Sequence, residues 1–525
     1  MENKQDSQNL DNTSHDGVGP LEKTDPAEAT DPEAQKTTTT TRPAYTAFST
    51  SEKWFIVIMT TMASFFSPLS GQIYYPVMPL LVQNYHLTTA LVNLSITTYM
   101  VLQGIAPSFM GTFSDASGRR PAYMLAFAIY TAANIGLALQ DSFAALLVLR
   151  CLQSAGSSGT VAFGYGVIAD VTTTGERGKF MGPMAAGVMV APALGPVIGG
   201  LLAQFLGWRS VFWFLVIISG SYLVVYVVLV PETSRKIVGD GSVPPQEWWR
   251  MSLLQYWKAR QQQQQQARRA VRESSNRQRK ISFPNPLRSV AILAEKDGLV
   301  IITYVGLLMF ANLVLMTSTP NIFPVLYGYN ELQVGLCFLP LGISACIGAV
   351  LNGKILDFSY RRTARKLGVS IDRRRGDDLR NFPIEKARLQ PVFFFLGLQL
   401  AAFLPYGWVL ERRAPLAAPL ILQFVMGLGI VASSNTLSTL LVDIFPDRPS
   451  TASAACNLVR CLLGAVGAAV VDYMLSGMGW GWCFFFVGMV MLVATGLLWV
   501  EMSYGMEWRR RRWERLEKRK QESST

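Results

Sequence analysis

The strongest constraint on this chain of 525 residues is its series of long apolar runs. Each run holds about 20 residues, the length that a helix needs to cross the hydrocarbon core of a bilayer. Because a bilayer core offers no water to backbone N–H and C=O groups, spans of this kind are expected to be helical. The sequence predicts an all-α membrane protein with twelve transmembrane helices, at 54–76, 91–111, 121–139, 144–168, 180–206, 211–231, 298–320, 333–356, 391–410, 415–443, 450–474 and 480–500.

Two loops in the chain repeat one skeleton, in which a glycine is followed four positions later by an aspartate and then by two arginines. The first runs from Gly111 to Arg120 and reads G-T-F-S-D-A-S-G-R-R; the second runs from Gly353 to Arg362 and reads G-K-I-L-D-F-S-Y-R-R. Each loop follows an apolar run, so the chain is expected to be a duplicated unit that forms two pseudo-symmetric six-helix bundles. The second copy has Tyr360 where the first has a glycine.

Lysine and arginine gather in the loops after the even-numbered spans, which by the positive-inside rule places both termini in the cytoplasm. The net charge of +12 then reflects topology and attraction to membrane lipid, so nucleic-acid binding is not expected. The glutamine-rich central loop is either an amphipathic helix on the inner leaflet or a low-complexity linker. The expected divisions are a disordered acidic cytoplasmic tail at 1–50, an N-terminal six-helix bundle at 51–231, the basic cytoplasmic linker at 232–297, a C-terminal six-helix bundle at 298–500 and a basic cytoplasmic tail at 501–525.

Further motifs follow in a fixed order along the chain. Residues 150–159 read R-C-L-Q-S-A-G-S-S-G, residues 191–200 read A-P-A-L-G-P-V-I-G-G, and Pro231-Glu232-Thr233 closes the sixth span. With the loop pattern G-x-x-x-D-x-x-G-R-R, this order resembles the major facilitator superfamily. A narrower resemblance, carried by segments such as 66–70, 103–109 and 457–464, is to fungal twelve-span drug:proton antiporters, in the branch with quinidine-resistance, dityrosine and citrate exporters.

That resemblance implies a monomeric exporter of a small-molecule cargo that works by alternating access, in exchange for protons, in the plasma membrane. It also implies a gate at the loop motifs. A carboxylate beside arginines at a helix end can hold a partner in one conformation and lose it in the other. The alternative is that the arginines only anchor the loop to headgroups. The expected gate residues are Gly111, Asp115, Gly118, Arg119, Arg120, Asp357 and Arg361.

Two arginines inside spans, Arg150 and Arg460, point to the transport site, because a charge deep in a membrane is costly unless it meets water, a partner or cargo. The alternative is a structural arginine bonded to carbonyl groups. No acid lies in the middle of spans 1, 4, 5, 7, 8 or 10, which favours neutral or anionic cargo and leaves facilitated export open. Candidates for proton coupling or the substrate cavity are Arg150, Gln153, Arg460, Asn457, Gln72, Tyr75, Met189 and Asn312.

The fifth span carries the residues expected to act in hinge motion or packing, because glycines allow close helix approach and prolines bend a helix. These are Pro192, Gly195, Pro196, Gly199 and Gly200.

Three functions fit the pattern. The favoured one is export of a drug-like toxin or secondary metabolite. By the resemblance, Met189 stands where citrate-exporting relatives carry an arginine, and methionine suits a larger, apolar cargo. The second is export of an organic acid such as citrate or itaconate, which the two arginines favour. The third is a sensor that transports nothing. The sequence has no nucleophile elbow, phosphate loop or metal cluster, so neither an enzyme nor a cofactor is expected.

Overall fold

The computed structural model describes residues 46, 48–173, 176–239, 247–255, 292–367, 382–446 and 448–524, all within one compact unit, Tyr45–Thr525. The predicted acidic tail, apart from its last residues, and most of the predicted central linker lie outside the described residues.

The described chain is helical over most of each predicted span. The first half contains α1 (Thr50–Gln72), η1 (Tyr75–Val77), α2 (Met78–Tyr85), α3 (Thr89–Ser117), α4 (Arg119–Leu139), α5 (Phe143–Ser158), α6 (Thr160–Val171), α7 (Arg177–Leu206) and α8 (Arg209–Leu229). The short α9 (Arg235–Val238) and η2 (Trp248–Arg250) follow. The second half contains α12 (Lys296–Tyr327), α13 (Glu331–Cys337), α14 (Leu339–Leu367), α15 (Ile384–Glu411), α16 (Ala417–Ile444) and α17 (Pro449–Ser524).

All twelve predicted spans have a helical counterpart. Ten helical stretches of the described chain are long and apolar enough to cross a membrane. The fourth predicted span is divided into α5, with 16 residues, and α6, with 12, so neither is long enough alone. The predicted eleventh and twelfth spans are joined in α17, where Gly479 (φ 79°) interrupts the helical backbone. The expected all-α membrane fold is confirmed.

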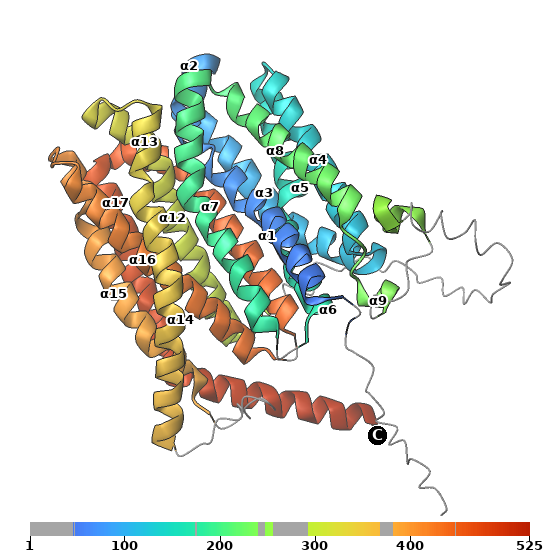
Figure 1. Ribbon diagram of the computed structural model, residues 1–525. Coiled ribbons are helices and arrows are strands. Elements are labelled where there is room, and N and C mark those ends of the chain that lie inside the picture. The colour runs from blue at the N-terminus through green and yellow to red at the C-terminus, as the bar shows by residue number, and fades with distance from the viewer. Residues whose placement is uncertain are drawn as a thin grey trace, which may run out of the picture. The chain divides into compact units, whose positions relative to one another are not determined.

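The helices gather in two groups that follow the order of the chain (Figure 1). Within the first, α1 packs on α7, and α4 packs on α5 and α8; within the second, α12 and α15 pack on α17. Aromatic side chains fill the first bundle, where the rings of Phe66 and Phe127 are 5.2 Å apart and those of Phe127 and Tyr222 are 4.6 Å apart. Tilted and edge-on ring pairs of this kind add packing energy beyond their buried area.

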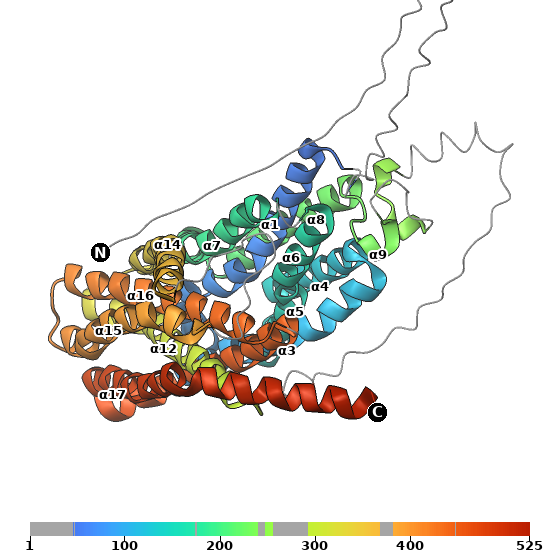
Figure 2. The ribbon, with the colours of Figure 1, turned by 90° about the horizontal axis from the view of Figure 1, so that it is seen from below.

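Successive spans alternate in direction, so the beginnings of α1, α4, α7, α12 and α15 share one end of the bundles with the ends of α3, α6, α14 and α16. We call this the charged end; Figure 2 views the molecule from that side. The bundles meet away from it. Thr97 of α3 donates to the carbonyl of Ala465 (3.4 Å), and the ring of Tyr75 stacks on that of Phe338 (5.9 Å). The described contacts between bundles therefore run from mid-span to the opposite end.

Candidate gate and transport site

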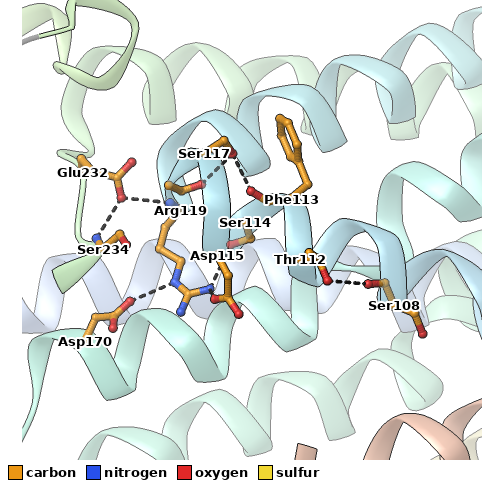
Figure 3. A network of polar contacts seen from close by, with 11 residues as sticks. Ser108, Thr112, Phe113, Ser114, Asp115, Ser117, Arg119, Asp170, Glu232 and Ser234 are labelled. Atoms are coloured by element: carbon orange, nitrogen blue, oxygen red, sulfur yellow. Dashed lines mark hydrogen bonds and ion pairs between the residues drawn. The ribbon is translucent and has the colours of Figure 1, made fainter. Parts of the chain in front are cut away.

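Arg119, the first residue of α4, is the centre of a polar network at the charged end (Figure 3). Its Nε lies 2.9 Å from Asp170 at the end of α6, and its Nη1 lies 2.9 Å from Asp115 and donates to Ser114 Oγ (3.0 Å). The Arg119 side chain is 15% exposed, whereas that of Asp115 is 53% exposed. One guanidinium thus holds α3 and α6 together, and Asp115 is its water-facing partner.

Glu232, which follows α8, completes this network from the other side. Its carboxylate accepts four backbone N–H bonds, from Arg119 (2.9 Å), Arg120 (3.1 Å), Thr233 (2.9 Å) and Ser234 (2.8 Å). Two of these donors belong to the first turn of α4, which has no partners for them within the helix. Burial raises the pKa of the Glu232 carboxyl, and the four N–H bonds oppose that shift.

The glycine of the first loop motif is needed for this arrangement. Gly118 has φ +112°, and a Cβ at this position would lie 2.4 Å from Oε2 of Glu232. A larger residue would be strained and would also displace the carboxylate that caps α4. Gly111 shows no such need, since a Cβ there meets nothing within 4 Å.

The second arginine of the motif has a different task from the first. Arg120 is buried, and it donates to the carbonyl of Val230 (3.0 Å) and to that of Val227 (2.5 Å). These carbonyls belong to the end of α8, where a helix has no internal donors for them. Arg120 therefore joins α4 to α8 and does not lie in the Asp115 pair.

The second loop motif does not form the expected gate pair. Asp357 and Arg361 are exposed on α14, and neither makes an ion pair with another described residue. The reason is Tyr360: the sequence has no glycine with positive φ here, so α14 continues to Leu367 instead of breaking. The tyrosine ring lies 5.5 Å from the guanidinium of Arg388.

A counterpart of the Arg119 network exists elsewhere in the second half. Arg388, near the start of α15, lies 3.1 Å from Asp443 at the end of α16, and both side chains are largely buried. The first half joins the start of α4 to the end of α6 in the same way, through Arg119 and Asp170. In the second half, residues outside the repeated loop therefore take the place that Arg119 and Asp170 have in the first.

Arg150 is enclosed in the first bundle. Its guanidinium lies over the rings of Tyr74 (4.0 Å) and Tyr99 (4.3 Å), and its Nη1 donates to Gln153 Oε1 (2.5 Å). Gln153 in turn donates to Asn134 (2.7 Å). The aromatic faces stabilise the cation, and no carboxylate contacts it among the described residues. In this conformation Arg150 joins α5 to α3 and to the end of α1, and through Gln153 to α4, which matches the structural alternative for this residue.

Arg150→Ala is therefore expected to lower the stability of the protein by about 3 kcal/mol, because it leaves a large cavity and removes the donor from Gln153. Thermal unfolding of purified protein measures this. Arg362→Ala is the matched control, since Arg362 is exposed and makes no described ion pair. Equal unfolding temperatures for the two variants would contradict the structural role.

Arg460, unlike Arg150, lies at the interface of the two bundles. It is half-buried on α17, its Nη2 donates to Asn457 Oδ1 (2.7 Å), and its buried Nε has no hydrogen-bond partner. Asn457 also reaches the other bundle, where it donates to the carbonyl of Gln103 (3.2 Å). A cation with an unused donor thus lies where α17 meets α3.

The other cavity candidates are spread over both bundles. Gln72 has a buried Oε1 without a partner, and Asn312 makes only a long contact to Met316 Sδ (3.9 Å). Tyr75 is used in the stacking contact between bundles. The carbonyl of Met189 accepts from Cys346 Sγ (3.3 Å), so Met189 lies where α7 meets α14. Arg460, Tyr75 and Met189 thus share the interface of the bundles, whereas Arg150 and Gln153 do not.

The glycines of the α7 motif are packing positions. A Cβ at Gly199 would lie 2.2 Å from the carbonyl oxygen of Ile73, and one at Gly195 would lie 2.7 Å from Gln72 Cβ, so α7 approaches the end of α1 closely. Gly200 approaches the other bundle, with a Cβ 2.5 Å from the carbonyl oxygen of Glu331. Pro192 and Pro196 lie inside α7, which remains helical from Arg177 to Leu206.

Sequence reasoning assigned no role to four residues of these networks, namely Asp170, Glu232, Arg388 and Asp443. A signal was available, since each lies at or near a predicted span end at the charged end. Comparing the corresponding span ends of the two halves would have found Arg388 and Asp443, because a duplicated unit places the ends of its spans, as well as its loops, at equivalent positions.

The comparisons with known proteins agree with this fold. The chain matches the Major Facilitator Superfamily over residues 60–371. It is 42% identical over 469 residues to MFS-type transporter phiD of Fungal sp., covering 89% of this chain and 70% of that protein. It is 40% identical over 468 residues to MFS-type transporter tstD of Talaromyces stipitatus, covering 89% and 84%.

A further relative and a solved structure extend the comparison. The chain is 34% identical over 485 residues to citrate exporter 1 of Aspergillus niger, covering 90% of each protein. The crystal structure of a D-xylose–proton symporter has the same fold, with a TM-score of 0.61 at 15% identity, covering 85% of this chain and 97% of that one. With twelve helical spans, a matched loop motif and these relatives, the chain belongs to the Major Facilitator Superfamily and is a multi-pass membrane transporter.

Proposed function

We propose that this transporter exports a neutral or anionic secondary metabolite or drug-like toxin from the cytoplasm across the plasma membrane, by alternating access. The observation that carries the proposal is Arg460, a half-buried cation at the meeting of the two bundles, with an unpartnered Nε and no ion pair to a carboxylate of the described residues. A buried cation of this kind favours an anion or a hydrogen-bond acceptor and repels cationic cargo.

The distribution of contacts supports alternating access. The Arg119 network joins helices of the first bundle only, and the Arg388–Asp443 pair joins helices of the second only. Neither network has to break for the bundles to rotate as rigid bodies about their interface. Such rocking about a central site is how transporters with paired repeats expose their cargo site to each side.

Proton exchange forms part of the proposal. Asp115 is the half-exposed, water-facing carboxylate of the Arg119 network, and we propose that exchange acts through this end of the protein. The membrane gradient then supplies the energy for export.

Export of an organic acid is the second candidate. It is favoured by the unpartnered Nε of Arg460 and by the relative named citrate exporter 1. Met189 at the bundle interface opposes a small tricarboxylate, because an apolar thioether there offers such an anion nothing to bind.

An export assay on Arg460 tests the cargo's charge. Metabolites are first compared in medium and cells after deletion and overexpression of the gene, with and without an uncoupler, which identifies the cargo. Efflux of that cargo and of its methyl ester is then measured in vesicles. Arg460→Gln is expected to slow efflux of the acid by about 10- to 100-fold, as loss of a charged hydrogen bond implies. The ester should be affected little.

Arg510→Gln is the matched control, since Arg510 lies on the same helix with its side chain 80% exposed. Wild-type efflux of an acidic cargo by Arg460→Gln would remove this residue from the site. A permanently cationic cargo would overturn the proposed substrate class.

A further inference from the structure

A compact charged cluster lies at the charged end of the second bundle, apart from the residues used so far. Its members come from the starts of α12 and α15 and from the last part of α17, and every one is at most 5% exposed. They are Asp297, Glu385, Glu501, Arg509 and Arg512. Charges removed from water to this degree are stable only when they are paired or neutralised.

Two of the three acids in the cluster are paired. Arg509 Nε lies 3.1 Å from Glu385, and Arg512 forms an ion pair with Asp297. The arginines also donate to backbone carbonyls, Arg509 to Phe382 (2.8 Å) and Arg512 to Ile444 (2.8 Å). These bonds fasten the last part of α17 to three other segments of the bundle.

Glu501 is the third acid, and it has no such partner. Its side chain is 0% exposed, and neither carboxyl oxygen makes a hydrogen bond. A Cβ at Gly505 would lie 2.6 Å from Glu501 Oε1 and 3.0 Å from Glu385 Cγ, so the free carboxyl group faces the cluster beside Glu385.

The first bundle shows how an ionised acid is held at the equivalent place. Glu232 and Glu501 each follow the last span of their half, yet Glu232 accepts four backbone N–H bonds and Glu501 accepts none. The environment of Glu232 suits a carboxylate, whereas that of Glu501 suits a carboxylic acid.

Charge balance gives the same result. Arg509 and Arg512 neutralise Glu385 and Asp297, so an ionised Glu501 would leave the buried cluster with one excess negative charge. The other charges that the structure describes nearby do not correct this: Glu295 pairs with Arg515 (2.9 Å) and Asp443 pairs with Arg388 (3.1 Å). Lys296 and Lys386 are exposed. One proton on Glu501 makes the cluster neutral.

We infer that Glu501 is a proton-binding site, and that its proton holds the final stretch of α17, residues 502–524, against the second bundle. Figures 1 and 2 show this stretch running crosswise to the spans toward the C-terminus. When the proton leaves, the third carboxylate repels Asp297 and Glu385, and the ion pairs of Arg509 and Arg512 open to water. The inference does not depend on the proposed cargo, and it makes docking of this helix sensitive to pH.

Hydrogen–deuterium exchange of the full-length protein in lipid nanodiscs tests the inference. In the docked helix Glu501 holds a proton, whereas in the undocked helix it is exposed and therefore ionised above about pH 5. Docking thus takes up one proton. The opening equilibrium of residues 502–524 should therefore rise by about tenfold for each pH unit, between about pH 6 and about pH 8, after correction for intrinsic exchange. Lower pH favours the docked helix.

Glu501→Gln mimics the protonated acid and should stay docked with no dependence on pH. Glu507→Gln is the matched control, because Glu507 lies on the same stretch but is exposed and pairs with Arg511; it should keep the wild-type slope. A flat wild-type profile, or an unchanged slope in Glu501→Gln, would overturn the inference.

Infrared spectroscopy gives a second readout that does not depend on docking. A band of a protonated carboxylic acid should be present in the wild type and in Glu507→Gln, and absent in Glu501→Gln. If this band is missing from the wild type, the site holds no proton and the inference is wrong.

Discussion

Arg119→Gln is expected to reduce transport by about 100-fold, whereas Arg361→Gln leaves it near the wild-type rate. Arg119 makes ion pairs with Asp115 and Asp170, and removing one partner of a largely buried pair costs about 3 kcal/mol or more. Arg361 occupies the matching place in the repeated loop but is exposed and makes no described ion pair. Efflux from vesicles measures both, with the amount of protein in the membrane determined separately.

Arg388→Gln completes this comparison, because the structure assigns to Arg388 the place that the loop motif assigns to Arg361. We expect a loss of transport similar to that of Arg119→Gln, since the pair with Asp443 is also largely buried. If Arg361→Gln were as inactive as Arg119→Gln while Arg388→Gln worked normally, the loop motif would be the better guide to the second gate.

The difference between the two halves shows which features a sequence can predict. The twelve spans follow from local apolar length, and the bilayer allows only one backbone form for them. Asp170 lies 51 positions from its partner Arg119, and Asp443 lies 55 positions from Arg388. Such pairs form only when the helices pack, so no local sequence pattern predicts them.

Burial of polar groups is also decided by packing. Arg150 and Arg460 look alike in sequence, as single arginines inside apolar runs. The Nε of each has no hydrogen-bond partner among the described residues. They differ in place: two tyrosines, one in the turn that follows α1 and one in α3, enclose Arg150, whereas Arg460 lies where the two bundles meet. Glu501 reads as an ordinary charge just beyond a span, and only the packed helix reveals that it is buried without a partner.

The second large effect is expected at Gly342, where α14 meets α7. A Cβ at Gly342 would lie 2.3 Å from the Cα atom of Ala193. Because this is a clash with backbone, it can be relieved only if one of the two helices moves. Alanine normally favours a helix over glycine by about 1 kcal/mol, so any loss in Gly342→Ala must come from the contact between bundles. We expect the bundles to separate here and transport to fall by at least about tenfold.

Thiol labelling of Cys346 reports this separation directly, because its Sγ lies 3.3 Å from the carbonyl oxygen of Met189 across the same interface. The rate at which Cys346 is labelled, measured on its own peptide, should be higher in Gly342→Ala than in the wild type. Gly220→Ala is the matched control, since a Cβ there meets nothing within 4 Å. Unchanged labelling together with unchanged transport would mean that the contact between α7 and α14 accommodates the added methyl group without separating, and would contradict this prediction.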